Sequence, residues 1–343
     1  MKIKDILKSA IEDIQKENNY VPAIVIKLSL KEYPKEAISK DNFIPEEEIT
    51  GGTATVRKGT GDKTGRHLVE KVITPRDVSK PHHRQFRSSI MHPEAAREIF
   101  GGQVAKQLGL DHYPEYTIKS SVRHKDPMKH RIVMHSTYVE GRPLLDFEDM
   151  QHVGESKEPV SFLLQKTLKK LNPESVAHAA IFNYIINHGD QHAGNFMVTK
   201  DNRLVPIDYG RSVHPLSQEV PLFSQDNHIL GRHFLDLHSK QTINPELLKK
   251  IADKKQNILS LLDKIVLPHY PEHLRQEVRE GMENRLQALA SLAEHKAPTF
   301  YHLSSLLKSS PNQEIDFFSP TRQAPQPENK NNVDLEAATR VAG

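Results

Sequence analysis

The sequence contains no cysteine. Disulfide bonds and thiolate metal sites are therefore excluded, and the composition suits a chain that works in a reducing cytosol. The chain also lacks a run of about 18 apolar residues, and it does not open with a basic segment followed by an apolar one. We therefore expect a soluble protein without a transmembrane segment or a signal peptide.

Net charge is nearly absent as well. The chain has 47 Lys and Arg against 44 Asp and Glu, a formal charge of +3, together with 20 His. Any attraction for anions must then come from local clusters, and no nucleic-acid partner is expected. The 343 residues, 36% of them hydrophobic, suffice for one large domain or two small ones, and no internal repeat is present.

Hydrophobic periodicity separates a strand-rich part from a helix-rich part. Alternation predicts strands at 53–57, 67–73, 116–122 and 131–139, and helical spacing predicts a helix from Pro93 to Gly109. We expect 58–65 to be a flexible glycine-containing connection and 31–50 to be a connector rich in Pro, Glu and Lys. Later helices are predicted at 162–171, 173–187, 232–240, 245–268, 271–295 and 301–308.

These patterns predict an α+β fold with four regions. Residues 1–44 form an N-terminal extension, with a helix at 2–17 and a strand at 21–30. A β-rich region covers 45–139, a mainly helical region covers 140–308, and the Pro- and Asn-containing stretch 309–343 is expected to be a disordered tail.

The most informative stretch runs from Asn187 to Val198 and continues to Gly210. Two short strands, 196–198 and 204–207, flank the turn 199–203, so a hairpin would bring Asn195 and Asp208 together at one end, near Asp190. Mg²⁺ prefers oxygen ligands, and phosphoryl transfer uses one Asp and one amide for metal with a separate Asp for the attacking hydroxyl. The spacing therefore indicates phosphoryl-transfer chemistry.

Two other kinds of metal site are alternative interpretations of the same residues. His188 and His192 are spaced as in a zinc-binding helix, but Gly189 interrupts it and no third ligand is evident. The run Gly189-Asp190-Gln191-His192 also resembles part of a binuclear metallophosphoesterase, whose remaining Asp, Asn and His clusters are not found in order along the chain.

The β-rich region supplies candidates for binding phosphate and nucleotide. Gly51 and Gly52 would let backbone N–H groups approach phosphate oxygens, and Lys71 on a following strand would reach them with its charge. A turn and a solvated lysine are the alternative interpretation. The chain is expected to leave the sheet from Met134 to Gly141, ahead of a hinge at 140–143 where backbone groups would hold a nucleotide base.

Two basic loops precede residue 132. A solvated charged turn and a polyanion site are both open interpretations of these loops. The first loop contains Arg76, Lys80, His82, His83, Arg84 and Arg87, and the second contains Arg123, His124, Lys125, Lys129, His130 and Arg131.

Five elements follow one another along the chain: Lys71 on a strand, an acidic helix that ends at 104–110, the segment 134–141, the stretch 188–196 and the run 207–210. Together and in this order they resemble an atypical kinase. The resemblance covers about residues 45–300 and is to the phosphatidylinositol 3/4-kinase-like and HipA-like branch, including bacterial effector kinases injected into host cells. It implies a two-lobed kinase fold that uses ATP and Mg²⁺, or Mn²⁺ in its place. Lys71 would hold the α- and β-phosphates, and Glu98 rather than Glu94 would pair with Lys71.

The resemblance implies roles for the remaining site residues as well. Asp190 would orient or deprotonate the acceptor, Asn195 and Asp208 would bind metal, and Gly51, Gly52 and Met134 would contact the nucleotide. The chain departs from ordinary protein kinases in three ways: it lacks three spaced glycines over the phosphates, it has Gly189 in place of an Arg, and no Ala-Pro-Glu follows Gly210. Activation-loop phosphorylation is therefore not expected.

The resemblance leaves the acceptor and the activator open. We expect a protein kinase of bacterial-effector type, able to phosphorylate itself and host proteins in the host cytoplasm. An inositol polyphosphate is the hypothetical activator bound by the basic loops. A phosphoinositide kinase in peripheral contact with a membrane is one alternative, and a polyanion-binding pseudokinase without turnover is another.

Overall fold

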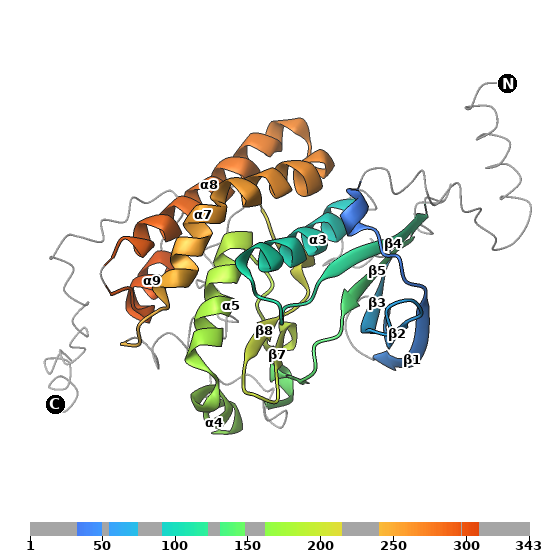
Figure 1. Ribbon diagram of the computed structural model, residues 1–343, viewed down its shortest axis with the longest axis horizontal. Coiled ribbons are helices and arrows are strands. Elements are labelled where there is room, and N and C mark those ends of the chain that lie inside the picture. The colour runs from blue at the N-terminus through green and yellow to red at the C-terminus, as the bar shows by residue number, and fades with distance from the viewer. Residues whose placement is uncertain are drawn as a thin grey trace, which may run out of the picture. The chain divides into compact units, whose positions relative to one another are not determined.

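The structure is a computed structural model that describes residues 33–49, 55–74, 91–122, 131–147, 162–214, 240–295 and 297–308 (Figure 1). The chain divides into two units, Met1–Gln313 and Glu314–Gly343, and all described residues belong to the first. The predicted helix at 2–17, the strand at 21–30, nearly all of the helix at 232–240 and the tail at 309–343 lie outside the described residues.

A five-stranded antiparallel sheet forms the β-rich part of the fold. Its strands are β1 (Phe43–Ile49), β2 (Thr55–Gly61), β3 (His67–Ile73), β4 (Tyr116–Val122) and β5 (Arg131–Thr137), in the order β1-β2-β3-β5-β4. The alternation of apolar residues predicted β3 and β4 with the bounds that the structure has. Because β3 lies at the centre of the sheet, Lys71 is held by pairing on both sides, opposite Val56 of β2 and Met134 of β5.

Two predictions about the first strands are wrong. The expected connector 31–50 contains β1, because this edge strand pairs through its backbone and points its glutamates to solvent, with Glu47 opposite Lys58 and Glu48 opposite Arg57. The expected flexible connection 58–65 is β-strand up to Gly61. Gly59 is needed inside the strand, since a Cβ there would lie 2.1 Å from the Ile44 carbonyl oxygen.

The predicted strand 131–139 is present as β5, which ends at Thr137, opposite Leu68. The segment from Met134 was also expected to leave the sheet, but it stays in β5 up to Thr137. Met134 is 1% exposed and pairs with both Lys71 and Ile118. The connection to the helical part therefore begins after Thr137, where burial between β3 and β4 no longer fixes the strand.

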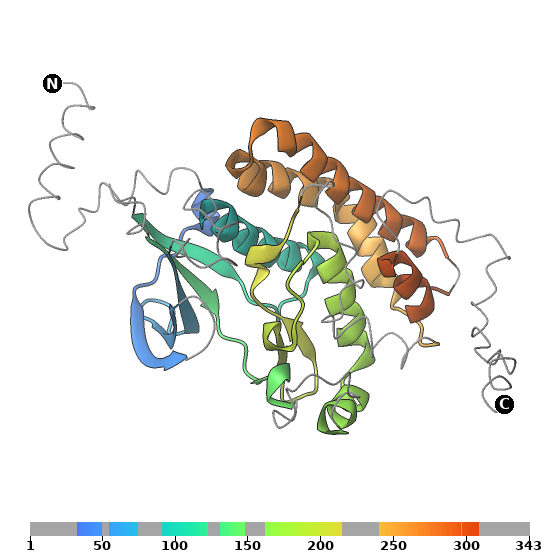
Figure 2. The same cartoon turned by 180° about the vertical axis from the view of Figure 1, so that it is seen from behind.

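Helix α3 (Met91–Leu108) connects β3 to β4 and bears the candidate acids. Its apolar residues Ala95, Ala96, Ile99 and Phe100 are fully buried, and the helix packs against β4 and β5 on one side and α7 on the other (Figures 1 and 2). It ends at Gly109, whose φ of 71° is the left-handed conformation that favours glycine. The predicted helix is confirmed, and its position between two layers fixes the direction of Glu98.

The helical part contains α4 (Phe162–Lys170), α5 (Pro173–Ile186), α7 (Pro245–Leu261), α8 (Glu272–Ala293) and α9 (Phe300–Lys308). These helices confirm the predicted periodic segments, although α7 passes into a π-helical turn at Leu262–Val266 and a 3₁₀ turn at Leu267–His269. No helix in the described part of the chain is long and apolar enough to cross a membrane.

Helix α5 carries the chain into the candidate site. Asn172 caps its start by accepting a hydrogen bond from the Ser175 N–H, and Pro173 occupies the first turn. Asn187, with a φ of 48°, ends it. Nearly every residue of α5 is buried, so the loop that follows starts from a fixed point.

A three-stranded sheet, β6-β7-β8, lies beside α5. Its strands are β6 (Arg142–Pro143), β7 (Phe196–Val198) and β8 (Leu204–Pro206), and β7 and β8 form the predicted hairpin, with Phe196 opposite Pro206. The Ile207 N–H donates to the Asn195 carbonyl oxygen at 2.8 Å, which joins the two ends of the hairpin.

Candidate functional site

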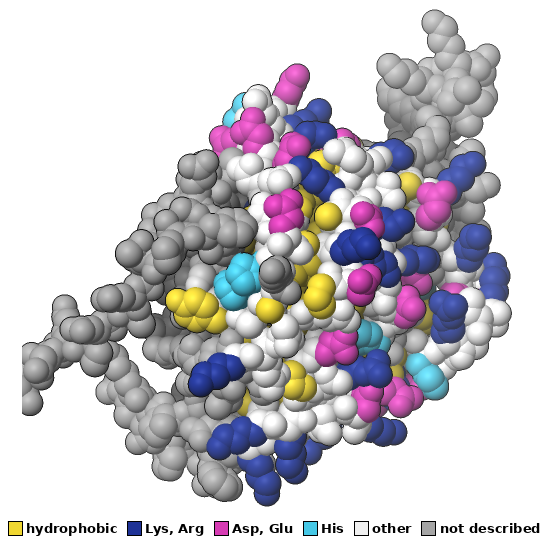
Figure 3. All heavy atoms as spheres, turned by 60° about the vertical axis from the view of Figure 1, so that its left-hand side comes forward, with side chains coloured by type: hydrophobic (Ala, Val, Ile, Leu, Met, Phe, Trp, Pro, Cys, Tyr) yellow, Lys and Arg dark blue, Asp and Glu magenta, His cyan; other side chains and the backbone are white. Residues whose placement is uncertain are grey.

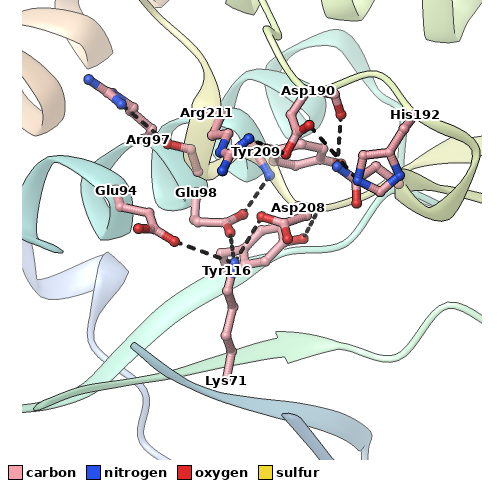
Figure 4. Close-up of polar contacts among 12 residues, drawn as sticks. Lys71, Glu94, Arg97, Glu98, Tyr116, Asp190, His192, Asp208, Tyr209 and Arg211 are labelled. Atoms are coloured by element: carbon pink, nitrogen blue, oxygen red, sulfur yellow. Dashed lines mark hydrogen bonds and ion pairs between the residues drawn. The ribbon is translucent and has the colours of Figure 1, made fainter. Parts of the chain in front are cut away.

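Lys71 lies at the centre of a cluster of acidic side chains (Figure 4). Its Nζ donates hydrogen bonds to Glu98 Oε1 at 2.7 Å and to Asp208 Oδ1 at 2.8 Å, and it lies 3.8 Å from Glu94 Oε1. The structure therefore brings both candidate glutamates to the lysine, with Glu98 in direct contact. Glu98 is fully buried, whereas the Asp208 side chain is 46% exposed.

Burial and charge act against each other in this cluster. Burial alone would lower the pKa of Lys71, but the nearby charges of Asp208, Glu98 and Glu94 outweigh it and hold that pKa well above its ordinary value. Burial raises the pKa of Glu98 to about 8 in spite of Lys71. For Asp208, the ammonium of Lys71 outweighs burial and keeps the carboxyl pKa below its ordinary value. The firmly ionised pair is therefore Lys71 with Asp208.

Two tyrosines hold Asp208 in place. The Asp208 N–H donates to the Tyr116 hydroxyl at 3.0 Å, and the Tyr209 N–H donates to Glu98 Oε2 at 2.7 Å. The Tyr209 ring packs closely on α3, where a Cβ at Gly101 would lie 2.3 Å from its Cδ2. Asp208 itself has a φ of 60°, a conformation that costs energy in a non-glycine residue. These contacts from β4 and α3 maintain it.

Asp190 is positioned by the loop that follows α5. Its N–H donates to His188 Nδ1 at 3.1 Å, and its carbonyl oxygen accepts from Asn195 Nδ2 at 2.7 Å. Since the amide nitrogen of Asn195 is used in this way, its Oδ1 oxygen faces the other direction as an acceptor. The structure therefore brings Asn195 to Asp190, and it joins the Asn195 backbone to Ile207, the residue before Asp208.

The two histidines of this loop have local structural partners. His188 is buried, and burial lowers its pKa, so the neutral ring accepts from Asp190. His192 accepts from the Gly194 N–H at 3.1 Å through Nδ1 and caps the 3₁₀ turn η7 (Ala193–Asn195). The segment between them is not helical, which removes the geometry that a zinc-binding helix needs.

The site contains a basic residue that the sequence did not single out. Arg211 Nη1 lies 3.2 Å from Asp190 Oδ2, and His192 Nε2 lies 3.9 Å from Asp190 Oδ1. The position of Arg211 three residues after Asp208 could have suggested it. Arg97 and Tyr116 were also missed, because only the folded chain brings Arg97 to the Gly210 carbonyl oxygen, at 3.3 Å, and Tyr116 to Asp208.

The donor set fits a magnesium–nucleotide complex better than a free metal ion. Within the described residues, no group of three or more His, Cys, Asp or Glu is arranged to hold a metal. Mg²⁺ is commonly bound by one or two protein oxygens, with phosphate oxygens and water completing the shell. Asn195 and Asp208 could supply such a pair, and Asp208 contacts Lys71, whose ammonium suits phosphate.

Several predicted site residues cannot be placed. Gly51 and Gly52 lie outside the described residues, as does nearly the whole of both basic loops: Arg76, Lys80, His82, His83, Arg84, Arg87, Arg123, His124, Lys125, Lys129 and His130. Arg131 is described, and it is exposed at the start of β5. Over the face seen in Figure 3, basic and acidic side chains are intermixed, as the small net charge suggests.

A family model described as phosphatidylinositol 3- and 4-kinase matches residues 104–226. The matched region contains Asp190, Asn195 and Asp208, and Lys71 and Glu98 precede it. The match supports a relation to the phosphatidylinositol 3/4-kinase-like family and indicates an ATP-dependent kinase. No curated protein matches the sequence significantly.

Proposed function

We propose that this ATP-dependent kinase transfers the γ-phosphate of ATP to a hydroxyl group held beside Asp190, within a two-lobed kinase-like fold. The observation that carries the proposal is the contact of Lys71 with Asp208, at 2.8 Å. It joins a lysine of the sheet to the end of the β7–β8 hairpin, next to Asp190 and Asn195. In the proposed complex, the phosphate chain would run from the Lys71 ammonium toward Asp190.

Each residue has a part in the proposed reaction. Lys71 binds the α- and β-phosphates, and Glu98 and Tyr116 keep Lys71 and Asp208 in place. The acceptor oxygen forms a bond to the γ-phosphorus, the bond from that phosphorus to the bridging oxygen breaks, and ADP leaves. Asp190 orients the acceptor hydroxyl and receives its proton.

The nucleotide and metal complete the site. Asn195 and Asp208 would hold Mg²⁺, or Mn²⁺, which when bound neutralises phosphate charge. The chain after Thr137 would provide backbone groups for the base. Met134, buried opposite Lys71 in the sheet, would lie beneath the nucleotide.

Protein hydroxyls are the acceptor that we propose first, including hydroxyls of the kinase itself. A bacterial-effector kinase acting on host proteins is the corresponding biological setting, and it rests on the sequence resemblance. A phosphoinositide is the second candidate, favoured by the description of the family model that matches residues 104–226. Both acceptors offer the same chemistry, a hydroxyl presented to Asp190.

An acceptor panel separates these candidates. The protein is incubated with γ-labelled ATP and Mg²⁺ together with itself, host-cell proteins or phosphoinositide vesicles, and Asp190→Ala and Asp208→Ala serve as controls. Label on protein supports the first candidate, and label extracted with lipid supports the second. Label that both variants retain would overturn the site assignment. If the wild type labels nothing, a polyanion-binding module without turnover becomes the better account.

An inositol polyphosphate is proposed as an activator, on the charge of the two basic loops alone. Arg131 is the one residue of these loops whose position is described. Inositol hexakisphosphate added to the purified protein should raise both its melting temperature and its ATP turnover. If neither quantity changes, this part of the proposal is wrong.

A further inference from the structure

Asp208 has two partners in the account above, and they compete. In the structure its Oδ1 accepts a hydrogen bond from Lys71 Nζ at 2.8 Å. In the proposed reaction the same carboxylate would hold Mg²⁺ while the ammonium holds phosphate. A divalent cation on the carboxylate repels the ammonium and weakens their contact. Lys71 therefore needs another acid when Asp208 turns to the metal.

Glu98 alone would not fix the direction of the lysine. An ammonium has three N–H donors. One donates to Glu98 Oε1 at 2.7 Å and one to Asp208. Glu98 is itself fixed, since it is fully buried and its Oε2 accepts from the Tyr209 N–H at 2.7 Å. Once Asp208 withdraws, a single contact would remain, and the ammonium could turn about it.

Glu94 lies beside the same ammonium. Its Oε1 is 3.8 Å from Lys71 Nζ, just beyond hydrogen-bond distance, and Figure 4 shows its carboxyl group directed at the lysine. Glu94 precedes Glu98 by one turn of α3, so the two lie on one face of the helix. Within the described part of the chain, its one ion pair is with Lys71.

The position of Glu94 is held by the helix and by the segment after Asp208. Glu94 lies in the first turn of α3, where the helix N-terminus favours a negative charge. A Cβ at Gly210 would lie 2.7 Å from Glu94 Cγ and 3.2 Å from its Oε1, so the backbone two residues after Asp208 packs against this side chain. The Glu94 side chain is only 17% exposed. An acid is thus kept beside the lysine without yet bonding to it.

We propose that Glu94 is a positioning residue, which takes the place of Asp208 at Lys71 when Asp208 turns to the metal. The ammonium makes the small movement, at the end of its flexible four-carbon stem. Two acids, Glu98 and Glu94, then hold it as before, and its third N–H is left for phosphate. No covalent bond forms or breaks. This inference rests on the proposed function, because Asp208 turns only if a metal–nucleotide complex binds.

A purely structural role for Glu94 predicts a different behaviour. An acid in the first turn of a helix stabilises that helix whether or not Asp208 is present. In the proposed role, the contribution of Glu94 is small while Asp208 holds Lys71 and grows when Asp208 is removed. The two roles therefore differ in whether the effects of Glu94 and Asp208 are additive.

The first measurement is a double-mutant cycle in the protein without nucleotide or metal. Glu94→Gln should change the melting temperature of the wild type by less than about 2 °C. In the Asp208→Ala background it should lower the melting temperature by at least about 2 °C more than in the wild type. Asp208→Asn repeats the cycle with a residue that tolerates the left-handed backbone at this position better than alanine does.

Glu115→Gln is the matched control for Glu94→Gln. Glu115 also pairs with a lysine, since its Oε1 lies 3.0 Å from Lys106 Nζ, but this pair lies on the surface. Its substitution should have the same effect on the melting temperature in the wild type and in the Asp208→Ala background.

The second measurement uses nucleotide. Glu94→Gln should weaken the thermal stabilisation by Mg²⁺–ADP and leave the stabilisation by ADP with EDTA unchanged, because Asp208 stays at Lys71 when no metal is present. Its kcat/KM for Mg²⁺–ATP should fall by about 10-fold, the lower end of what is lost when a residue that orients a metal site is removed. Glu115→Gln should resemble the wild type in each case.

The remaining outcomes separate this inference from the proposed function. Additive effects of Glu94→Gln and Asp208→Ala would overturn the role of Glu94 alone. A Glu94→Gln variant whose stabilisation by ADP is weakened equally with Mg²⁺ and with EDTA would do the same, because that pattern indicates a structural role. A wild type that Mg²⁺–ADP does not stabilise and that transfers no γ-phosphate would overturn the proposed function, and this inference with it.

Discussion

Lys71 and Asp208 are 137 positions apart in the chain, yet Lys71 Nζ lies 2.8 Å from Asp208 Oδ1. The contact exists because β3 is the middle strand of the sheet and the β7–β8 hairpin ends beside α3. Three carboxyl groups surround this ammonium, and of these Asp208 is firmly ionised, because Lys71 holds its pKa below the ordinary value.

The first prediction concerns the stability that Lys71 provides. Lys71→Met should lower the free energy of unfolding by about 1–3 kcal/mol, less than for a fully buried pair because Asp208 is partly exposed. Lys106→Met removes a lysine that contacts Glu115 at 3.0 Å on the surface of the same helix layer, and it should cost less than about 1 kcal/mol. Urea denaturation measures both, and equal losses would contradict the account.

The second prediction concerns the pH dependence of stability. Because burial raises the pKa of Glu98 to about 8 from 4.5, the folded chain binds a proton that the unfolded chain releases. The resulting stabilisation is complete below about pH 4.5 and is lost as the pH rises through about 8. Its size is on the order of a few kcal/mol.

Glu98→Gln isolates this effect, because glutamine does not titrate. The melting temperature of the wild type minus that of Glu98→Gln should fall steadily from pH 5 to pH 8, a window set by the Glu98 pKa. The difference cancels the titration of other groups to first order. A difference that stays level or rises over this range would contradict the buried, proton-binding role of Glu98.

The sequence predicted the elements whose signal is local. Strand β4 and the hairpin follow from alternation and turn residues, and α5 follows from its apolar periodicity, its Pro173 and its Asn187. The spacing of Asp190, Asn195 and Asp208 on this frame was enough to indicate phosphoryl transfer. These elements keep the types, and nearly the bounds, that the local signals predict, because packing in the folded chain does not override those signals.

The parts that sequence missed depend on partners distant in the chain. Strand β1, with three glutamates and a proline, carries no apolar alternation and exists because β2 pairs with it. Gly59 suggested a turn in the sequence, because glycine is common in turns. Only the structure shows that it lies in a strand, close against the Ile44 backbone. Arg211 and Tyr270 become notable only when Asp190 and Arg97 are seen beside them.

The third prediction concerns Tyr270, which ties α3 to the segment after Asp208. Its hydroxyl donates to the Val213 carbonyl oxygen at 2.5 Å and accepts from Arg97 Nε at 3.0 Å. Tyr270→Phe should lower the free energy of unfolding by about 1–2 kcal/mol, because both partners lose a bond in a buried setting. Amide hydrogen exchange should quicken in residues 209–213.

Tyr113→Phe is the control for Tyr270→Phe. The Tyr113 hydroxyl is buried, and among the described residues it has no hydrogen-bond partner. Removing it should therefore change the free energy of unfolding by less than about 0.5 kcal/mol, or raise it. If the two substitutions cost the same, the hydrogen bonds of Tyr270 do not hold the segment.

The fourth prediction concerns Gly101, where α3 meets Tyr209. Glycine to alanine in a helix normally stabilises by about 1 kcal/mol. Gly101→Ala should instead destabilise by about 1–3 kcal/mol, because the new Cβ would lie 2.3 Å from Tyr209 Cδ2 and would force the ring away. Turnover should fall as well, because the Tyr209 N–H donates a hydrogen bond to Glu98 and Tyr209 directly follows Asp208. A shift of Tyr209 would therefore displace both acids.

A second substitution provides the control for Gly101→Ala. Replacing Tyr209 with leucine in the Gly101→Ala background removes the clashing ring and should restore part of the lost stability. Thermal melting of the two single variants and the double variant measures this coupling. Strictly additive losses would show that the Gly101–Tyr209 contact is not the cause.

The central claim is that Asp190, Asp208 and Lys71 form one site that removes the γ-phosphate from ATP. The most direct measurement is the rate at which γ-labelled phosphate leaves ATP, to protein, lipid or water, in the wild type and in Asp208→Asn with Mg²⁺ present. We predict measurable transfer by the wild type and a loss of at least about 10²-fold in Asp208→Asn, with the fold retained. Equal rates in the two proteins would contradict the account.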